Sequence, residues 1–106
     1  MNLLISSVRA GDRLTIGLRG ELDYGTAPAL REAISTALAA DPLPATISVD
    51  LGGVTVVDST GLGTLVVGYR ICAQVRVRLA VCNPTPFVSR LLSVTGADTH
   101  LVRAAD

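Results

Sequence analysis

Two kinds of hydrophobic periodicity alternate along this chain, and their order constrains the fold more than any other feature. Alternation of apolar residues with polar or small ones is typical of strands with one buried face. Predicted strands lie at residues 3–8, 14–18, 47–57 and 77–81. Apolar residues three or four positions apart are typical of helices, and these are predicted at residues 26–38, 62–69 and 87–92. A last edge strand is expected at Leu101-Val102.

Helical segments that alternate with apolar strands favour an α/β fold. We expect a mixed β-sheet of four to five strands, covered by about three to four helices. A length of 106 residues provides room for one core, and no repeat, linker or low-complexity segment divides it. The sequence therefore predicts a single domain over residues 1–106.

The composition is that of a globular protein, because 49% of the residues are hydrophobic and 17% are charged. No apolar run approaches the ~20 residues that span a bilayer. The first residues lack the basic start and long apolar stretch of a secretory leader. Cys72 and Cys82 are too few for a disulfide framework, and both are expected to be small buried residues. We therefore expect a cytoplasmic protein without a membrane partner.

The charges are balanced, with nine basic residues, all of them Arg, and nine Asp and Glu. Nucleic-acid binding depends on an excess of positive charge, so the balance argues against it. The absence of Lys excludes a P-loop lysine and Schiff-base chemistry. One His and two distant Cys supply too few ligands for a zinc site, and no cofactor is expected.

The segment from Val56 to Gly63 joins a predicted buried strand to a predicted helix. Asp58 and Ser59 are favoured residues at a helix start, where their oxygens accept free backbone N–H groups, so a purely structural cap is one interpretation. A functional interpretation rests on the glycines at positions 61, 63 and 68, each of which costs a helix ~1 kcal/mol relative to Ala. Together with Thr60, Thr64 and Val67 they would form a flat face of small residues for a partner. Packing of some glycines against the domain's own sheet is the alternative.

Three enzymatic interpretations of this segment fail. Gly61-x-Gly63 is typical of a dinucleotide loop, but Val66 occupies the third glycine position. The Asp-Ser-Thr-Gly sequence has its Gly one residue too late for an aspartic protease. A serine hydrolase would need a base beside Ser59, and nothing in the sequence positions His100, the sole His, there. We therefore expect a protein that is not an enzyme.

Several segments together resemble the STAS family, and in particular its small stand-alone members, the anti-sigma factor antagonists. The resemblance covers nearly the whole chain. It rests on Gly20-Glu21-Leu22-Asp23, Val49-Asp50-Leu51, Asp58-Ser59-Thr60-Gly61-Leu62-Gly63, Asn83, and Val88-Ser89-Arg90-Leu91-Leu92 followed by Thr95-Gly96. One departure is Thr60, which stands where a second Ser is common in the family.

The resemblance implies a partner-switching cycle. The unmodified antagonist binds an anti-sigma factor of the serine kinase type and so releases a sigma factor. The kinase phosphorylates Ser59, with Asp58 as its orienting neighbour and Asp23 on an adjacent loop, and a Ser/Thr phosphatase reverses the modification. The expected partner-binding residues are Asp23, Asp58, Ser59, Thr60, Gly61, Gly63, Thr64 and Val67. Small size and balanced charge favour a monomer.

Two alternatives use the same loop differently. A scaffold or transporter-complex subunit of the same fold would bind a protein or a small ligand without phosphorylation. A nucleotide- or lipid-binding protein would use backbone N–H groups at residues 61–63, with Arg70 nearby. The absence of Lys and the low aromatic content, 3% of the chain, argue against the second.

Overall fold

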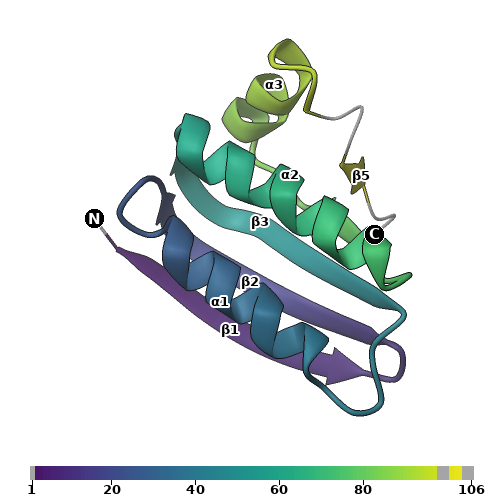
Figure 1. Cartoon of the computed structure of the whole chain (residues 1–106). Coiled ribbons are helices and arrows are strands. Elements are labelled where there is room, and N and C mark those ends of the chain that lie inside the picture. The colour runs from purple at the N-terminus through teal and green to yellow at the C-terminus, as the bar shows by residue number, and fades with distance from the viewer. Residues whose placement is uncertain (1, 98–100, 104–106) are drawn as a thin grey trace.

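The computed structural model describes residues 2–97 and 101–103, and these form one sheet with helices packed on it (Figure 1). The sheet has five strands in the order β1-β2-β3-β4-β5. Their bounds are β1 Leu3–Ala10, β2 Arg13–Leu22, β3 Thr46–Val57, β4 Arg78–Cys82 and β5 Val102–Arg103. β1 and β2 are antiparallel and all later neighbours are parallel, so the predicted mixed α/β sheet is confirmed.

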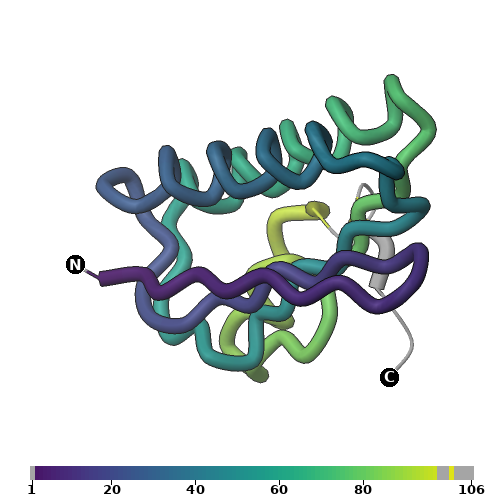
Figure 2. The backbone as a smooth tube through the Cα atoms, turned by 90° about the horizontal axis from the view of Figure 1, so that it is seen from below, coloured from purple at the N-terminus to yellow at the C-terminus, as the bar shows by residue number. Residues whose placement is uncertain are grey.

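Three helices complete the described fold: α1 Ala27–Leu38, α2 Ser59–Gln74 and α3 Pro86–Val94. Figure 2 shows α1 and α2 side by side in a layer over one face of the sheet. Pro28 lies in the first turn of α1, where its missing N–H removes no helical hydrogen bond. Thr85 caps the start of α3, and its hydroxyl accepts a hydrogen bond from the Val88 N–H at 3.3 Å. No helix within the described ranges is long and apolar enough to cross a bilayer.

The hydrophobic core lies between the sheet and the helices packed on it, and Val88 and Leu92 of α3 belong to the same buried cluster as the residues under α1 and α2. Ile16, Val49 and Val81 are neighbours in register on three adjacent strands, and all three are fully buried. Leu30 from α1 and Leu65 from α2 are equally inaccessible to solvent. Burying a side chain of this size contributes about 1.5–3 kcal/mol, so the alternating residues that predicted the strands also stabilise the fold.

The structure differs from the predicted boundaries at several element ends. β2 continues through Gly20 to Leu22, which lies on the same buried face as Leu14, Ile16 and Leu18, while the pairing with β3 shifts register on either side of Gly20. Gly20 has φ +119° and lies against the backbone of Asn2, a position that only glycine fits. α1 begins at Ala27 and ends at Leu38, within one residue of the predicted range, and the last strand begins at Val102, one residue later than expected. His100 lies outside the described residues.

Candidate functional site

Asp58 is the residue that joins the end of β3 to the start of α2. Its backbone is extended, and its side chain caps the helix by accepting a hydrogen bond at Oδ1 from the Gly61 N–H at 2.8 Å. Its other oxygen, Oδ2, accepts from the Tyr24 N–H at 2.9 Å. One carboxylate therefore fixes the helix start and also ties it to the loop that follows β2.

These hydrogen bonds favour the ionised form of the carboxylate. The Gly61 N–H is the main cause that lowers the pKa of Asp58 below its ordinary value of 3.8, with smaller contributions from Tyr24 and Thr60. Partial desolvation opposes the shift without cancelling it. The site therefore carries a fixed negative charge at neutral pH beside Ser59.

Asp58→Asn is expected to lower the melting temperature at neutral pH, because the amide is a weaker acceptor than the carboxylate. A carboxylate whose folded-state pKa lies below 3.8 stabilises the fold above that value, and this contribution is lost as the pH falls through the folded-state pKa. The melting-temperature difference between the variant and the unsubstituted chain should therefore narrow on acidification. Thermal unfolding followed across a pH series measures it. A difference that stays constant at every pH would contradict the electrostatic role.

The loop after β2 is held by its own hydrogen bonds. Asp23 is 7% exposed, and its Oδ1 accepts from the N–H groups of Gly25 at 2.9 Å and Thr26 at 3.1 Å. The Thr26 hydroxyl accepts from the Asp23 N–H at 2.9 Å and donates to the Glu21 carbonyl at 2.7 Å. The Asp23 carboxylate is thus turned inward and organises the loop, and its contact with a partner stays a prediction.

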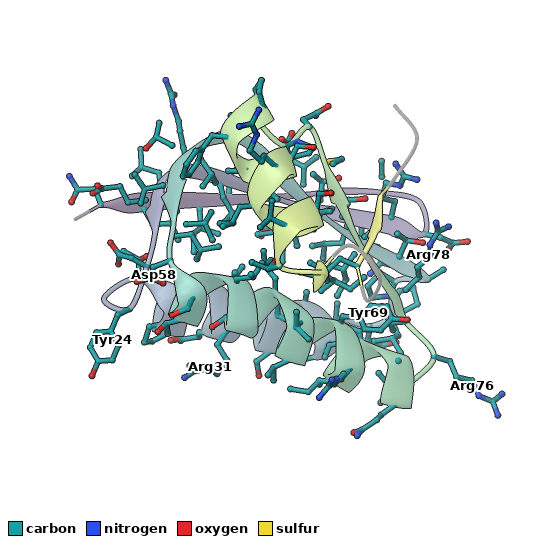
Figure 3. The ribbon with its side chains drawn as sticks, turned by 90° about the horizontal axis from the view of Figure 1, so that it is seen from above. Tyr24, Arg31, Asp58, Tyr69, Arg76 and Arg78 are labelled. Carbon is teal, nitrogen blue, oxygen red and sulfur yellow. The ribbon has the colours of Figure 1, made fainter. Side chains whose placement is uncertain are left out.

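Tyr24 is the residue that this loop presents to solvent. Its side chain is 78% exposed, and Figure 3 shows the ring pointing away from the protein beside the helix start where Asp58 lies. Sequence reasoning missed it, because a single aromatic residue in a turn has no periodicity. The only available signal was its rarity, since the chain contains two Tyr, one Phe and no Trp.

Ser59 and Thr60 are both exposed, but they face different sides of α2. Ser59 borders a shallow depression shared with Leu62 and with residues 95–97. No hydrogen-bond partner for the Ser59 hydroxyl is found in residues 2–97 and 101–103. Thr60 instead faces α1, and its carbonyl accepts a hydrogen bond from the Thr64 hydroxyl at 3.0 Å. The two hydroxyl groups are therefore distinct in their surroundings although they are adjacent in sequence.

A groove of about 520 Å³ runs between α1 and α2 and begins at Thr60. Its lining residues are Arg31, Ile34, Ser35 and Leu38 from α1, and Thr60, Gly63, Thr64, Val67, Gly68 and Ile71 from α2. Val67 and Ile71 are 49% and 43% exposed, so apolar surface is accessible along it. Four of the predicted partner-binding residues thus share one concave surface, which α1 completes.

The three glycines of α2 have different surroundings. A Cβ at Gly61 would lie 2.4 Å from the Leu22 carbonyl oxygen, and one at Gly68 would lie 2.8 Å from Ile34 Cδ1. Both glycines are buried, so they allow α2 to approach β2 and α1. The prediction that Gly61 belongs to the partner surface is therefore corrected to packing inside the domain. Gly63 is exposed, a Cβ at this position would meet nothing within 4 Å, and the residue fits the predicted surface.

Other reactive groups lie outside this arrangement. Cys72 is fully buried, and burial raises the pKa of its thiol to about 11, which makes it an unreactive core residue. The described residues contain no group of three or more His, Cys, Asp and Glu that could hold a metal ion. The chemistry that the site offers is a solvent-facing hydroxyl beside a fixed carboxylate and an apolar groove.

Known proteins of one family match nearly the whole chain. A family model described as "Mlab, STAS domain" matches residues 5–103. An anti-sigma F factor antagonist from Paenibacillus polymyxa is 32% identical over 96 residues, which cover 91% of this chain and 81% of that protein. An anti-sigma-B factor antagonist from Listeria monocytogenes is 31% identical over 97 residues, which cover 91% of this chain and 83% of that protein.

The fold leads to the same group of proteins. The unphosphorylated form of the anti-sigma factor antagonist SpoIIAA superposes with a TM-score of 0.77 at 25% identity, over 99% of this chain and 90% of that one. The relatives are named for antagonism, which is a regulatory binding activity and not a catalysed reaction. Since the family model and both relatives span nearly all of it, this chain belongs to the STAS domain family, among the anti-sigma factor antagonists.

Proposed function

We propose that this protein binds a kinase-type anti-sigma factor in the cytoplasm and is released from it by phosphorylation of Ser59. The observation that supports this most directly is the exposed Ser59 hydroxyl in the first turn of a helix whose cap, Asp58, is fixed by two backbone N–H groups. The protein acts by binding, and the reaction belongs to the partner kinase. A Ser/Thr phosphatase restores the binding form.

The surface for the partner surrounds Ser59. Tyr24 provides an exposed aromatic side chain on one side of it, and aromatic residues are enriched among residues that dominate binding energies. The groove provides apolar surface from Val67 together with the small or polar positions Thr60, Gly63 and Thr64. A helix or loop of the partner that covers both features would remove water from the Ser59 hydroxyl.

Phosphorylation then changes binding rather than folding. A phosphate adds about −1.5 to −2 charges beside the ionised Asp58. In the free protein this charge remains in solvent and lies at a helix start, where the helix dipole favours negative charge. In the complex the same charge would have to be desolvated next to another carboxylate. The modified state is therefore compatible with the fold and incompatible with the interface.

The site of modification can be tested with two matched variants. Incubation with a cognate kinase-type anti-sigma factor and ATP is expected to add one phosphate, located at Ser59 by peptide mass spectrometry. Ser59→Ala should abolish incorporation, and Thr60→Val, which keeps the shape of the rival residue, should leave it unchanged. Phosphate on Thr60 in the unsubstituted chain would contradict the proposal. Binding without any incorporation would favour the scaffold alternative.

A further inference from the structure

β1 forms an open edge of the sheet. Within the described residues it pairs only with β2, so one side of its backbone has no strand neighbour (Figure 1). Natural proteins protect such edges with charged residues, proline, bulges or very short strands. β1 spans eight residues, and Leu3 to Val8 contain no charge and no proline. An edge of this kind is a template for pairing with another strand.

We infer that a second copy of this chain pairs with the β1 edge, in antiparallel orientation about a two-fold axis through Ser6. The side chains of Leu4 and Val8 are 66% and 65% exposed, and both lie on the same face of β1 as Ser6 because residues two apart share a face. Leu3 and Ile5, on the other face, already pack against the core. The two large exposed residues of β1 are thus free for an intermolecular contact.

Their spacing suits this symmetry. Leu4 and Val8 are equidistant from Ser6, so the axis places Leu4 of each copy opposite Val8 of the other. Residues directly opposite in an antiparallel pair share a face and contact each other. Two Leu–Val pairs then flank one Ser–Ser pair, and no like charges meet in this central stretch. The interface is self-complementary, as a two-fold dimer requires.

Arg9 is the one charged residue on β1, and it does not shield the edge. Its guanidinium donates hydrogen bonds to the carbonyl oxygens of Gly11 and Pro42, within its own copy. The charge is therefore held toward the end of the strand, away from Ser6.

The dimer is compatible with the proposed switch and does not depend on it. β3, which leads into Ser59, is the third strand of the sheet, while pairing occurs at the outer side of the first. Two sheets would join into one, and both Ser59 sites would remain accessible. A single strand pair is a small interface, so we expect reversible association and not a permanent dimer. This inference differs from the monomer expected from size and charge, and sedimentation decides between them.

Sedimentation velocity of the full chain tests the association. Concentrations from about 1 µM to 1 mM cover the range of weak interfaces, and the unsubstituted protein should shift from monomer toward dimer across it. Ser6→Lys places two positive charges opposite each other on the axis and should raise the dissociation constant at least about tenfold. Gln74→Lys adds the same charge at the far end of α2 and should change nothing. A monomer at every concentration would overturn the inference, as would equal effects of the two variants.

Cysteine cross-linking tests the register. In a Cys82→Ser background, Ser6→Cys should form a disulfide-linked dimer on mild oxidation, because opposite residues have Cα atoms about 4.5–5.5 Å apart, within disulfide reach. Ser7→Cys is the control. The Cα atoms of the two substituted residues would be offset by two residue rises along the strand and by one strand spacing across it. They would therefore lie about 8 Å apart, which is too far for a disulfide. Cross-linking of Ser7→Cys at the same rate as Ser6→Cys would rule out the proposed axis.

Discussion

Ser59→Asp is expected to weaken binding to a kinase-type anti-sigma factor at least about a hundredfold. The substitution places a second carboxylate beside Asp58, which is already ionised because backbone N–H groups lower its pKa. Burying that charge in an interface shaped for a neutral hydroxyl should cost about 3 kcal/mol, and each ~1.4 kcal/mol is a factor of ten in affinity. Titration calorimetry with the purified anti-sigma factor measures the dissociation constant directly.

Two neutral variants separate charge from shape. Ser59→Asn has the same shape as the aspartate variant without its charge, and Ser59→Ala removes the hydroxyl alone, so both should bind far more tightly than Ser59→Asp. The melting temperature of Ser59→Asp should remain close to that of the unsubstituted protein, since an exposed acidic residue in a first helical turn is tolerated. Equal affinities for the aspartate and asparagine variants would remove the electrostatic basis of the switch.

The order of strands and helices was predictable because burial repeats along the sequence. Every second residue of β3 from Ile47 to Leu51 is buried, and a period of two identifies a strand without knowledge of its neighbours. The end of β2 was not predictable in the same way. Leu22 keeps the alternation of the earlier buried residues, but Gly20 interrupts the apolar pattern, and its positive φ and close approach to Asn2 are set by tertiary structure. Such irregularities depend on contacts between segments far apart in the sequence, and local periodicity carries no information about those contacts.

The residues at the centre of the candidate site were predictable from the sequence, but the role of Asp23 and the presence of Tyr24 and Arg31 around them were not. Asp58 and Ser59 occur at a strand-to-helix junction, and residue type alone marks them as a cap and an accessible hydroxyl. Asp23 is also an aspartate, but its carboxylate accepts hydrogen bonds from neighbouring N–H groups, and this depends on the loop conformation. Tyr24 and Arg31 enter the site only because the loop and α1 lie beside α2. Neither position carries a sequence pattern that indicates this.

Gly61→Ala is expected to be the most destabilising single change in the site. The new Cβ would lie 2.4 Å from the Leu22 carbonyl oxygen and 3.0 Å from its carbonyl carbon, and backbone atoms of a central strand cannot move aside as a side chain can. Overpacking of this kind costs about 3 kcal/mol, toward the upper end of its usual range. The gain in helix propensity offsets about 1 kcal/mol of this cost, so at about 4–8 °C per kcal/mol for a domain of this size the melting temperature should fall by about 8–16 °C.

Gly63→Ala is the matched control, because it makes the same substitution two residues further along the same helix. Its Cβ would meet nothing within 4 Å, so only the gain in helix propensity remains, about 1 kcal/mol, and the melting temperature should rise by a few degrees. The melting temperature should thus fall for Gly61→Ala and rise for Gly63→Ala, because only the start of α2 lies close to Leu22. If both variants were stabilised, α2 would have to stand away from β2 in solution. The fixed position of the Asp58 cap, and with it the presentation of Ser59, would then lose its physical basis.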